Sequence, residues 1–139
     1  MNVADLFAQA ALCYPDKKAL IFGSGSYTYS EMHGIIGALA RYLTDIGVSE
    51  GDRVSIYMAN RPEWIMFYYA IAKIGAIGVC VPGAYKTEEM KGVVNDSLSC
   101  AIITSEALLA QFPPPDAIPH IRRVIVVERD EILQSVLRG

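Results

Sequence analysis

The sequence predicts an α/β fold in which a mostly parallel sheet carries helices on both faces. From residue 53 onward, apolar strand-like runs alternate with helical patterns, which is typical of this class. The run 51–83 indicates a strand, a helix and a second strand joined by short links, the pattern of a right-handed parallel crossover. Apolar residues make up 53% of the 139 positions, enough for a core and some apolar surface besides. We therefore expect one domain's worth of structure.

The first strand of this crossover is expected over residues 53–59, where apolar and β-branched residues are as dense as in a strand covered on both faces. The next residues indicate a helix start. Asn60 is expected to cap the helix and Pro62 to occupy its first position, while Glu63 complements the positive end of the helix dipole. The sequence therefore predicts a sharp turn between strand and helix.

The helix of the crossover is predicted over residues 62–74. From Trp64 onward it is apolar on nearly every side, which predicts a helix buried all round, with Trp64 buried at its start. Gly75 is expected to end it in the left-handed conformation. A second strand over 76–81 then stops at Pro82.

A competing interpretation treats residues 64–85 as a membrane span, because they hold a single charge in a long enough stretch. Lys73 would then lie near the bilayer centre at a cost of about 2.5–3.5 kcal/mol. Gly75, Gly78 and Pro82 also interrupt the run. A soluble core with no transmembrane span is favoured.

The N-terminal region predicts a helix followed by a small hairpin. Asn2 is expected to cap a helix over 2–13, and strands are expected over 18–22 and 27–29. The glycines at 23 and 25 invite a phosphate-loop interpretation, but a strand rather than a helix follows, so a hairpin turn is favoured. The apolar residues expected to face inward from the helix are Val3, Leu6, Phe7 and Ala10.

The next helix is predicted from Ser30, as its cap, to Gly47, with Glu31 adding negative charge to the first turn. Its apolar stripe comprises Met32, Ile35, Ile36, Leu39, Ala40 and Leu43.

After the crossover we expect a helix over 88–97 capped by Thr87, with Met90, Val93 and Val94 facing inward. The remaining expected elements are a strand over 100–104, a brief helix from Ser105 to 111, an extended Pro-rich loop over 112–119, a strand over 124–128 and a helix over 130–138.

Composition excludes several classes. The net charge of −3 and the lack of a basic stripe argue against a nucleic-acid partner. The N-terminus has no secretory pattern, so we expect a cytoplasmic protein. Cys13, Cys80 and Cys100 are scattered in apolar contexts, which predicts buried, reduced thiols rather than disulfides or a metal site.

Residue types that commonly carry catalysis have plain structural explanations here. His33 lies within a predicted helix and His120 in a Pro-flanked loop, where structural or solvated roles are favoured. Glu88 and Glu89 begin a helix, where the helix dipole stabilises carboxylates. No Walker, zinc-protease, nucleophile-elbow or dinucleotide pattern occurs. Residue chemistry alone thus predicts an α/β domain without an assigned reaction.

A set of ordered motifs is more specific. Tyr-Thr-Tyr-Ser-Glu-Met at 27–32 and Ala-Lys-Ile-Gly-Ala-Ile-Gly-Val-Cys-Val-Pro at 72–82 resemble two characteristic segments of the adenylate-forming enzymes, which include acyl-CoA synthetases, luciferases and peptide-synthetase adenylation domains. The connecting segments 47–54 and 60–64 fit the same order, and the similarity runs from about residue 2 to 128. Asn-Arg-Pro-Glu-Trp resembles the acyl-CoA synthetase branch in particular, which implies a carboxylic or fatty acid substrate.

The resemblance implies activation of a carboxylate with ATP and magnesium to an acyl-adenylate, followed by transfer to a thiol such as coenzyme A. The family's catalytic, nucleotide and metal segments have no counterpart among these residues, so we expect no catalytic, cofactor-binding or metal-binding residue in this chain. Open α/β sheets bind ligands at strand carboxyl ends, which makes Gly83, Tyr85 and Lys86 candidates for a ligand cleft. The matched residues expected to be architectural are Tyr29, Glu31, Asn60, Pro62, Glu63, Trp64, Gly75 and Pro82.

The sequence is accordingly identified as resembling the N-terminal part of an AMP-forming acyl-CoA synthetase, a single partial domain over 1–139 that is inactive alone. Its expected partner is the remainder of the enzyme, or a second copy bound through exposed apolar surface. Two alternatives stay open. One is a stand-alone, non-catalytic α/β domain that binds a protein partner, and the other, less favoured, is a flavodoxin-like or receiver-like domain.

Overall fold

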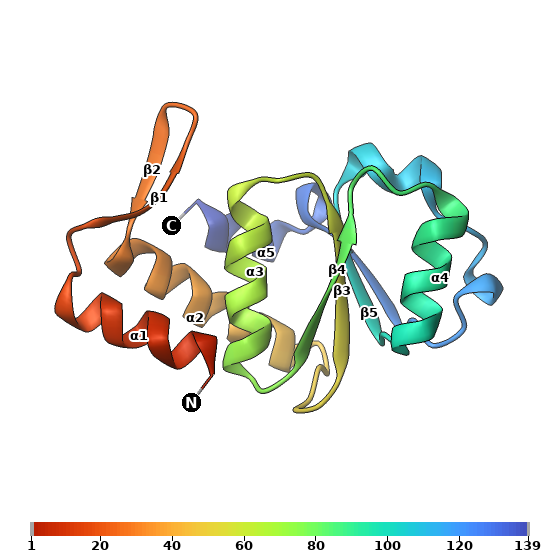
Figure 1. Ribbon diagram of the computed structural model, residues 1–139, viewed down its shortest axis with the longest axis horizontal. Coiled ribbons are helices and arrows are strands. Elements are labelled where there is room, and N and C mark those ends of the chain that lie inside the picture. Colours follow the sequence, from red (N-terminus) through yellow and green to blue (C-terminus); the bar gives the residue numbers. More distant parts are fainter. Residues whose placement is uncertain (1, 139) are drawn as a thin grey trace.

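The computed structural model describes residues 2–138, so Met1 and Gly139 at the ends of the predicted domain lie outside the described residues. It confirms the mixed α/β fold. The main sheet has four strands in the order β4-β3-β5-β6, and all neighbouring pairs are parallel. A separate antiparallel hairpin projects near the N-terminus (Figure 1). The strands are β1 (Lys18–Phe22), β2 (Gly25–Thr28), β3 (Arg53–Met58), β4 (Ile77–Pro82), β5 (Ala101–Thr104) and β6 (Arg123–Val126).

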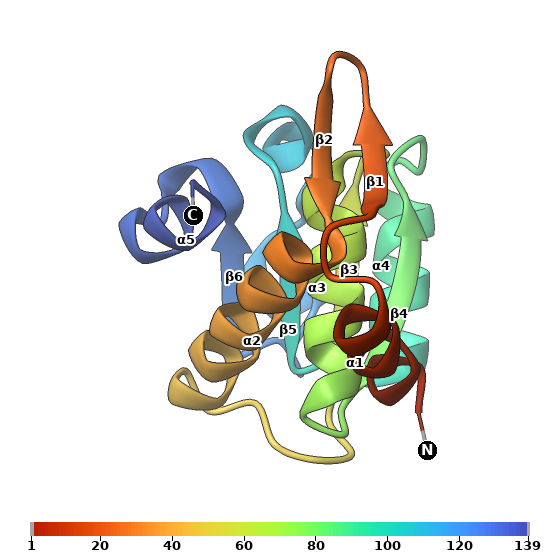
Figure 2. The same cartoon turned by 90° about the vertical axis from the view of Figure 1, so that its left-hand side faces the viewer.

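Helices cover both faces of this sheet. Helices α1, α2, α3 and α5 lie on one face and α4 lies on the other (Figure 1). Figure 2 shows the sheet from the multi-helix face, with β6 at one side and β4 at the other. The α-helices are α1 (Val3–Cys13), α2 (Tyr29–Asp45), α3 (Pro62–Lys73), α4 (Thr87–Ser97) and α5 (Glu131–Leu137), and the 3₁₀ helices are η1 (Glu106–Gln111), η2 (Pro115–Ala117) and η3 (Val127–Arg129).

The sheet separates two hydrophobic cores. Alternate residues of a strand point to opposite faces, so adjacent Ile102 and Ile103 enter different cores. Ile103 packs with α2, α3 and α5, whereas Ile102 packs with Met90 and Val94 of α4. Both isoleucines are fully buried. The chain therefore buries both faces of its sheet, as the dense apolar strands predict.

The predicted crossover is confirmed. Strands β3 and β4 are parallel neighbours, with Arg53 opposite Ile77 and Met58 opposite Pro82, and α3 connects them. Gly75 ends the helix with a φ of +77°, the left-handed conformation that favours glycine. Residues 64–85 thus form part of a helix, a turn and a strand, and no helix within residues 2–138 is long and apolar enough to cross a membrane.

Two details of α3 differ from expectation. The N-cap residue is Arg61 rather than Asn60, although Pro62 does occupy the first helical position. The helix is also not buried all round, because Trp64 is only half-buried and Tyr68 is 38% exposed. These two rings stack on each other with centroids 5.5 Å apart. The helix instead buries one face, through Met66, Phe67, Ala70 and Ile71.

Helix α2 confirms its predicted apolar stripe, all six residues of which are buried. Its start lies two residues earlier than expected, because Thr28 rather than Ser30 is the cap. The Thr28 hydroxyl accepts from the Glu31 N–H at 3.1 Å, and the Glu31 carboxylate accepts from the Thr28 N–H at 3.0 Å. This reciprocal pair is a capping box. The bond from the Thr28 N–H lowers the pKa of Glu31.

The N-terminal helix is confirmed, with Asn2 as its cap. Its buried face is rotated from the predicted one, however. Ala4 and Ala11 are buried, while Val3 and Leu6 are exposed. Phe7 sets this orientation by packing against aromatic rings of α2 and α3 at 5.3 and 4.9 Å between centroids.

The thiols are not buried as predicted. Cys13 and Cys80 are exposed, and Cys100 is partly exposed. Cys80 is accessible because β4 is an edge strand, which an apolar sequence pattern does not distinguish from a central one.

The C-terminal half keeps the predicted order of elements with corrections at their ends. The N-cap of α4 is Lys86 rather than Thr87, and Ser105 begins a 3₁₀ helix without contributing a side-chain cap. The Pro-rich loop contains the 3₁₀ turn η2 instead of being extended throughout. Strand β6 ends at Val126, two residues before the predicted end, because η3 follows.

Candidate functional site

The turn after β4 lies at the carboxyl end of the sheet, as predicted for the ligand-cleft candidates. Gly83 lies close against the end of β3. A Cβ atom at this position would lie 3.1 Å from the Met58 carbonyl carbon and from the Ala59 nitrogen. Because the contacted atoms are backbone, they can yield less easily than the end of a flexible side chain. Glycine therefore suits this position, where two strand ends pack closely.

Tyr85 and Lys86 complete this turn. The Tyr57 hydroxyl donates to the Tyr85 carbonyl oxygen at 2.5 Å, and the Tyr57 carbonyl oxygen accepts from the Thr104 hydroxyl at 2.7 Å. Burial, followed by the nearby Glu89 carboxylate, raises the pKa of Tyr57, which keeps its phenol protonated as a donor. Lys86 is exposed, and its backbone N–H donates to the Glu89 carboxylate at 3.1 Å. The turn is thus held by hydrogen bonds to β3 and α4.

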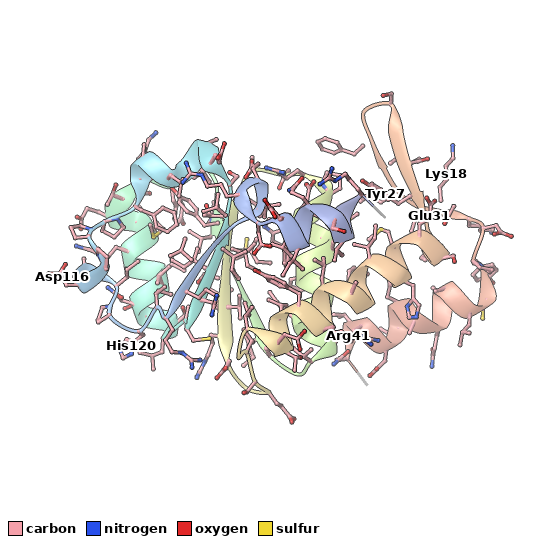
Figure 3. All side chains as sticks on the ribbon, turned by 180° about the vertical axis from the view of Figure 1, so that it is seen from behind. Lys18, Tyr27, Glu31, Arg41, Asp116 and His120 are labelled. Carbon is pink, nitrogen blue, oxygen red and sulfur yellow. The ribbon has the colours of Figure 1, made fainter. Side chains whose placement is uncertain are left out.

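The eight residues expected to be architectural do not converge on one site. Tyr29 and Glu31 lie at the start of α2, and Figure 3 shows Glu31 beside Tyr27 at the base of the hairpin. Pro62 and Trp64 lie at the start of α3. Gly75 lies at the opposite end of that helix, where its carbonyl oxygen accepts from the Gly51 N–H at 2.9 Å. This distribution is typical of residues that set turns and helix ends.

A charged network that sequence reasoning missed joins the carboxyl ends of three strands. Arg61 follows β3 and forms ion pairs with Glu63 at 2.9 Å and with Glu128, after β6, at 3.0 Å. The other oxygen of Glu128 accepts from the backbone N–H of Glu106, after β5, at 3.1 Å. Arg129 closes the network by pairing with the Glu106 carboxylate at 2.7 Å.

Ion pairing and hydrogen bonding in this network shift the pKa values of Arg61 and Glu128. The hydrogen bond to Glu63 is the largest influence that raises the pKa of Arg61. Burial lowers this pKa, and the hydrogen bond to Glu128 raises it further. Burial raises the pKa of Glu128, but hydrogen bonds from Arg61 and from backbone N–H groups together outweigh it and leave this pKa below its ordinary value. The Glu128 carboxylate therefore stays ionised and hydrogen-bonded at neutral pH, a poor state for a general base.

We expect Glu128→Gln to lower the free energy of unfolding by about 0.5–1.5 kcal/mol at neutral pH, a value reduced by solvent screening. Since the folded-state pKa of Glu128 is lowered, its stabilisation is complete above the ordinary value of 4.5 and disappears as pH falls through the folded-state value. Urea melts from pH 7 to 3 should show the two proteins converging at the acid end. Glu88→Gln, which removes an exposed surface ion pair, is the control. A difference in unfolding free energy between wild type and Glu128→Gln that stays constant with pH would contradict the stabilising role of the Glu128 carboxylate.

Two cavities lie beside the motif residues. One of about 510 Å³ lies between the start of α2 and the end of α5, next to Tyr27 and Glu31 (Figure 3). A smaller one of about 120 Å³ lies between the hairpin and Trp64. Neither brings a nucleophile together with a free base, and residues 2–138 contain no group of three His, Cys, Asp or Glu side chains placed to hold a metal.

Comparison with known proteins assigns the family. Residues 7–138 match the family model described as "AMP-binding enzyme". The medium/long-chain-fatty-acid–CoA/3-oxocholest-4-en-26-oate–CoA ligase of Mycobacterium tuberculosis is 33% identical over 130 residues, which are 92% of this chain and 24% of that protein. The crotonobetaine/carnitine–CoA ligase of Escherichia coli is 35% identical over 118 residues, which are 81% of this chain and 22% of that protein. This chain thus spans about a quarter of the length of these relatives.

Solved structures agree. The fatty acyl CoA synthetase of Mycobacterium tuberculosis superposes with a TM-score of 0.86 and 25% identity, over 99% of this chain and 28% of that one. The N-terminal domain of FACL13 from the same organism superposes with a TM-score of 0.84 and 27% identity. The match covers 100% of this chain and 36% of that one. The motif order, the parallel sheet and the family match therefore agree, and the chain belongs to the AMP-binding enzyme family of adenylate-forming ligases, matching their N-terminal domain.

Proposed function

We propose that this chain supplies the N-terminal scaffold of an AMP-forming acid–thiol ligase and does not catalyse the reaction by itself. The observation that carries the proposal is the family match over residues 7–138, in a fold superposable over nearly its whole length on an acyl-CoA synthetase. The complete reaction would activate a carboxylic acid with ATP to an acyl-adenylate and then form a thioester. In this proposal residues 1–139 act as one partial domain.

The substrate class follows from the relatives. Those compared are fatty-acid–CoA and carnitine–CoA ligases, which supports a carboxylic or fatty acid as substrate and coenzyme A as acceptor. ATP, magnesium and coenzyme A would be bound mainly by segments that correspond to the rest of these relatives. The turn 83–86 would form part of the cleft wall, because ligands of open α/β sheets bind at strand carboxyl ends.

The proposed division of labour has a chemical basis. Adenylation requires hydrogen-bond donors around the triphosphate, a magnesium site and a cation near the reacting carboxylate. Among the described residues, the arginines at the carboxyl end of the sheet are already paired with glutamates. Lys86 and Lys91 lie near the turn, but two lysines without a backbone cradle attract anions only loosely.

The chain's partner would be the remainder of the ligase, with self-association as the alternative when that part is absent. Large apolar side chains exposed on several elements, among them Ile21, Phe22, Tyr68 and Ile77, favour association of some kind. They are also the observation in favour of the second candidate function, a stand-alone domain that binds a protein partner. In either case we place the protein in the cytoplasm.

We expect the purified chain to show no acid-dependent exchange of pyrophosphate into ATP with any carboxylic acid. A family ligase assayed in parallel provides the positive control. Exchange that disappears in Lys86→Ala would contradict the proposal, because it would place catalytic groups in this chain. An in-frame continuation of the gene that encodes a Ser/Thr/Gly-rich loop would favour the ligase over the stand-alone domain.

A further inference from the structure

The connections that follow β3, β4 and β5 leave the sheet at the same end, the upper one in Figure 1. Tyr57, the next-to-last residue of β3, lies between the other two strands, opposite Val81 of β4 and Thr104 of β5. Its side chain is fully buried in the core on the α4 side of the sheet. This one residue is therefore placed to contact the connections that leave both neighbouring strands.

The hydroxyl of Tyr57 reaches the connection after β4, where it donates to the Tyr85 carbonyl oxygen at 2.5 Å. The N–H of the same peptide group belongs to Lys86 and donates to the Glu89 carboxylate at 3.1 Å. Both polar groups of the Tyr85–Lys86 peptide are therefore hydrogen-bonded, one to β3 and the other to α4. The Tyr85 N–H in turn donates to the Pro82 carbonyl oxygen at 3.0 Å. These bonds together fix the backbone orientation of the turn.

The rest of Tyr57 contacts the connection after β5. Its carbonyl oxygen accepts from the Thr104 hydroxyl at 2.7 Å, and its ring centroid lies 6.0 Å from that of Phe112. Gln111, next to Phe112, accepts from the Thr87 hydroxyl at the start of α4 at 3.3 Å. The connections after β4 and β5 are therefore tied to each other directly and through Tyr57.

The turn held in this way has side chains of alternating exposure. Pro82, Ala84 and Lys86 are exposed, whereas Gly83 and Tyr85 are half-buried. The Tyr85 side chain packs against the core on the α4 side of the sheet. Rotation of the Tyr85–Lys86 peptide would break the hydrogen bonds at both of its ends. The hydrogen-bonded orientation of this peptide thus determines which side chains of the turn point outward.

We propose that Tyr57 is a positioning residue of the ligand cleft, whose hydroxyl fixes the turn 83–86 so that Ala84 and Lys86 face the cleft. The inference rests on the proposed function in one respect, namely that this turn borders the cleft. Because Tyr57 is fully buried, it acts through the turn and does not itself touch the ligand. The Tyr85 carbonyl oxygen already accepts from the phenol. The turn is therefore a preformed wall and not a loop that becomes ordered when a ligand binds.

Removal of one hydroxyl group tests this role. Tyr57→Phe keeps the ring and deletes the donor. We expect amide hydrogen exchange at Tyr85 and Lys86 to become about three- to tenfold faster, the effect of one lost hydrogen bond on local opening. The carbonyl carbon of Tyr85 should shift upfield, because its oxygen no longer accepts from a phenol. Tyr42→Phe is the matched control and should change neither signal, since it removes a buried tyrosine hydroxyl that donates to Asp130 in the other core.

A structural role confined to the core predicts a different pattern. Exchange would then become faster throughout β3 and β5, with no additional effect at residues 85 and 86. That pattern, or unchanged exchange at these two residues in folded Tyr57→Phe, would overturn the proposal.

The wild-type chain provides a second measurement, which does not depend on whether Tyr57→Phe folds. Backbone order parameters of residues 83–86 should be about 0.85, as in rigid elements, and values below about 0.6 would contradict a preformed wall. None of these measurements involves acyl transfer. A failure of the positioning role is therefore distinguishable from a failure of the proposed ligase function.

Discussion

We expect Phe67→Ala to lower the free energy of unfolding by about 3–5 kcal/mol, the range for removing a large side chain from a packed core. Phe67 is 0% exposed and lies on the buried face of α3 against the sheet. A domain of this size has only about 5–15 kcal/mol of stability in total, so this loss would leave it close to unfolding. Urea melts of the two proteins provide the measurement.

Trp64→Ala is the informative comparison, because the sequence predicts Trp64 to be the buried anchor of the same helix. In the structure Trp64 is half-buried and stacked on Tyr68, which is itself 38% exposed. Its loss should cost only about 1–2 kcal/mol. If Trp64→Ala proved as damaging as Phe67→Ala, the assignment of the inward face of α3 would be wrong.

The second large effect is expected on the opposite face of the sheet. Met90 is 0% exposed and lies between α4 and the sheet, in contact with the core around Tyr57 and Ile102. Met90→Ala should therefore lower the free energy of unfolding by about 2–5 kcal/mol. Leu12→Ala, at a position 84% exposed, is a matched truncation that should change stability by less than about 0.5 kcal/mol. Equal effects of the two substitutions would show that α4 does not cover a core.

The sequence predicts the β3–α3–β4 crossover well because its determinants are local. The short links between β3, α3 and β4 favour a second strand that runs parallel to the first. Gly75 ends the helix through its own left-handed conformation, which does not depend on distant residues. Helix starts were less accurate because several residues near each start can cap. Ser30 and Thr28 lie two positions apart, and Glu31 selects Thr28 by completing the reciprocal hydrogen bonds.

Exposure and charge pairing could not be read from the sequence. Cys80 lies in an apolar run suited to a central strand, but strand order places it at the sheet edge. Arg61 and Glu128 are 67 positions apart and meet only because β3 and β6 end at the same side of the sheet. The pairing of Arg61 with Glu63 and Glu128 is the main reason to assign a structural role to the carboxyl edge of the sheet in this chain.

Equilibrium binding of ATP with magnesium tests the central claim most directly, namely that this chain is scaffold rather than catalytic centre. Calorimetry and backbone amide shifts of the isolated chain should show no saturable site for ATP or AMP. Small, salt-sensitive shifts near Lys86 and Lys91 are compatible with loose anion attraction. Saturable binding with stoichiometric shifts in the turn 83–86 that persist at high salt would contradict the account, because it would place a complete nucleotide site within these residues.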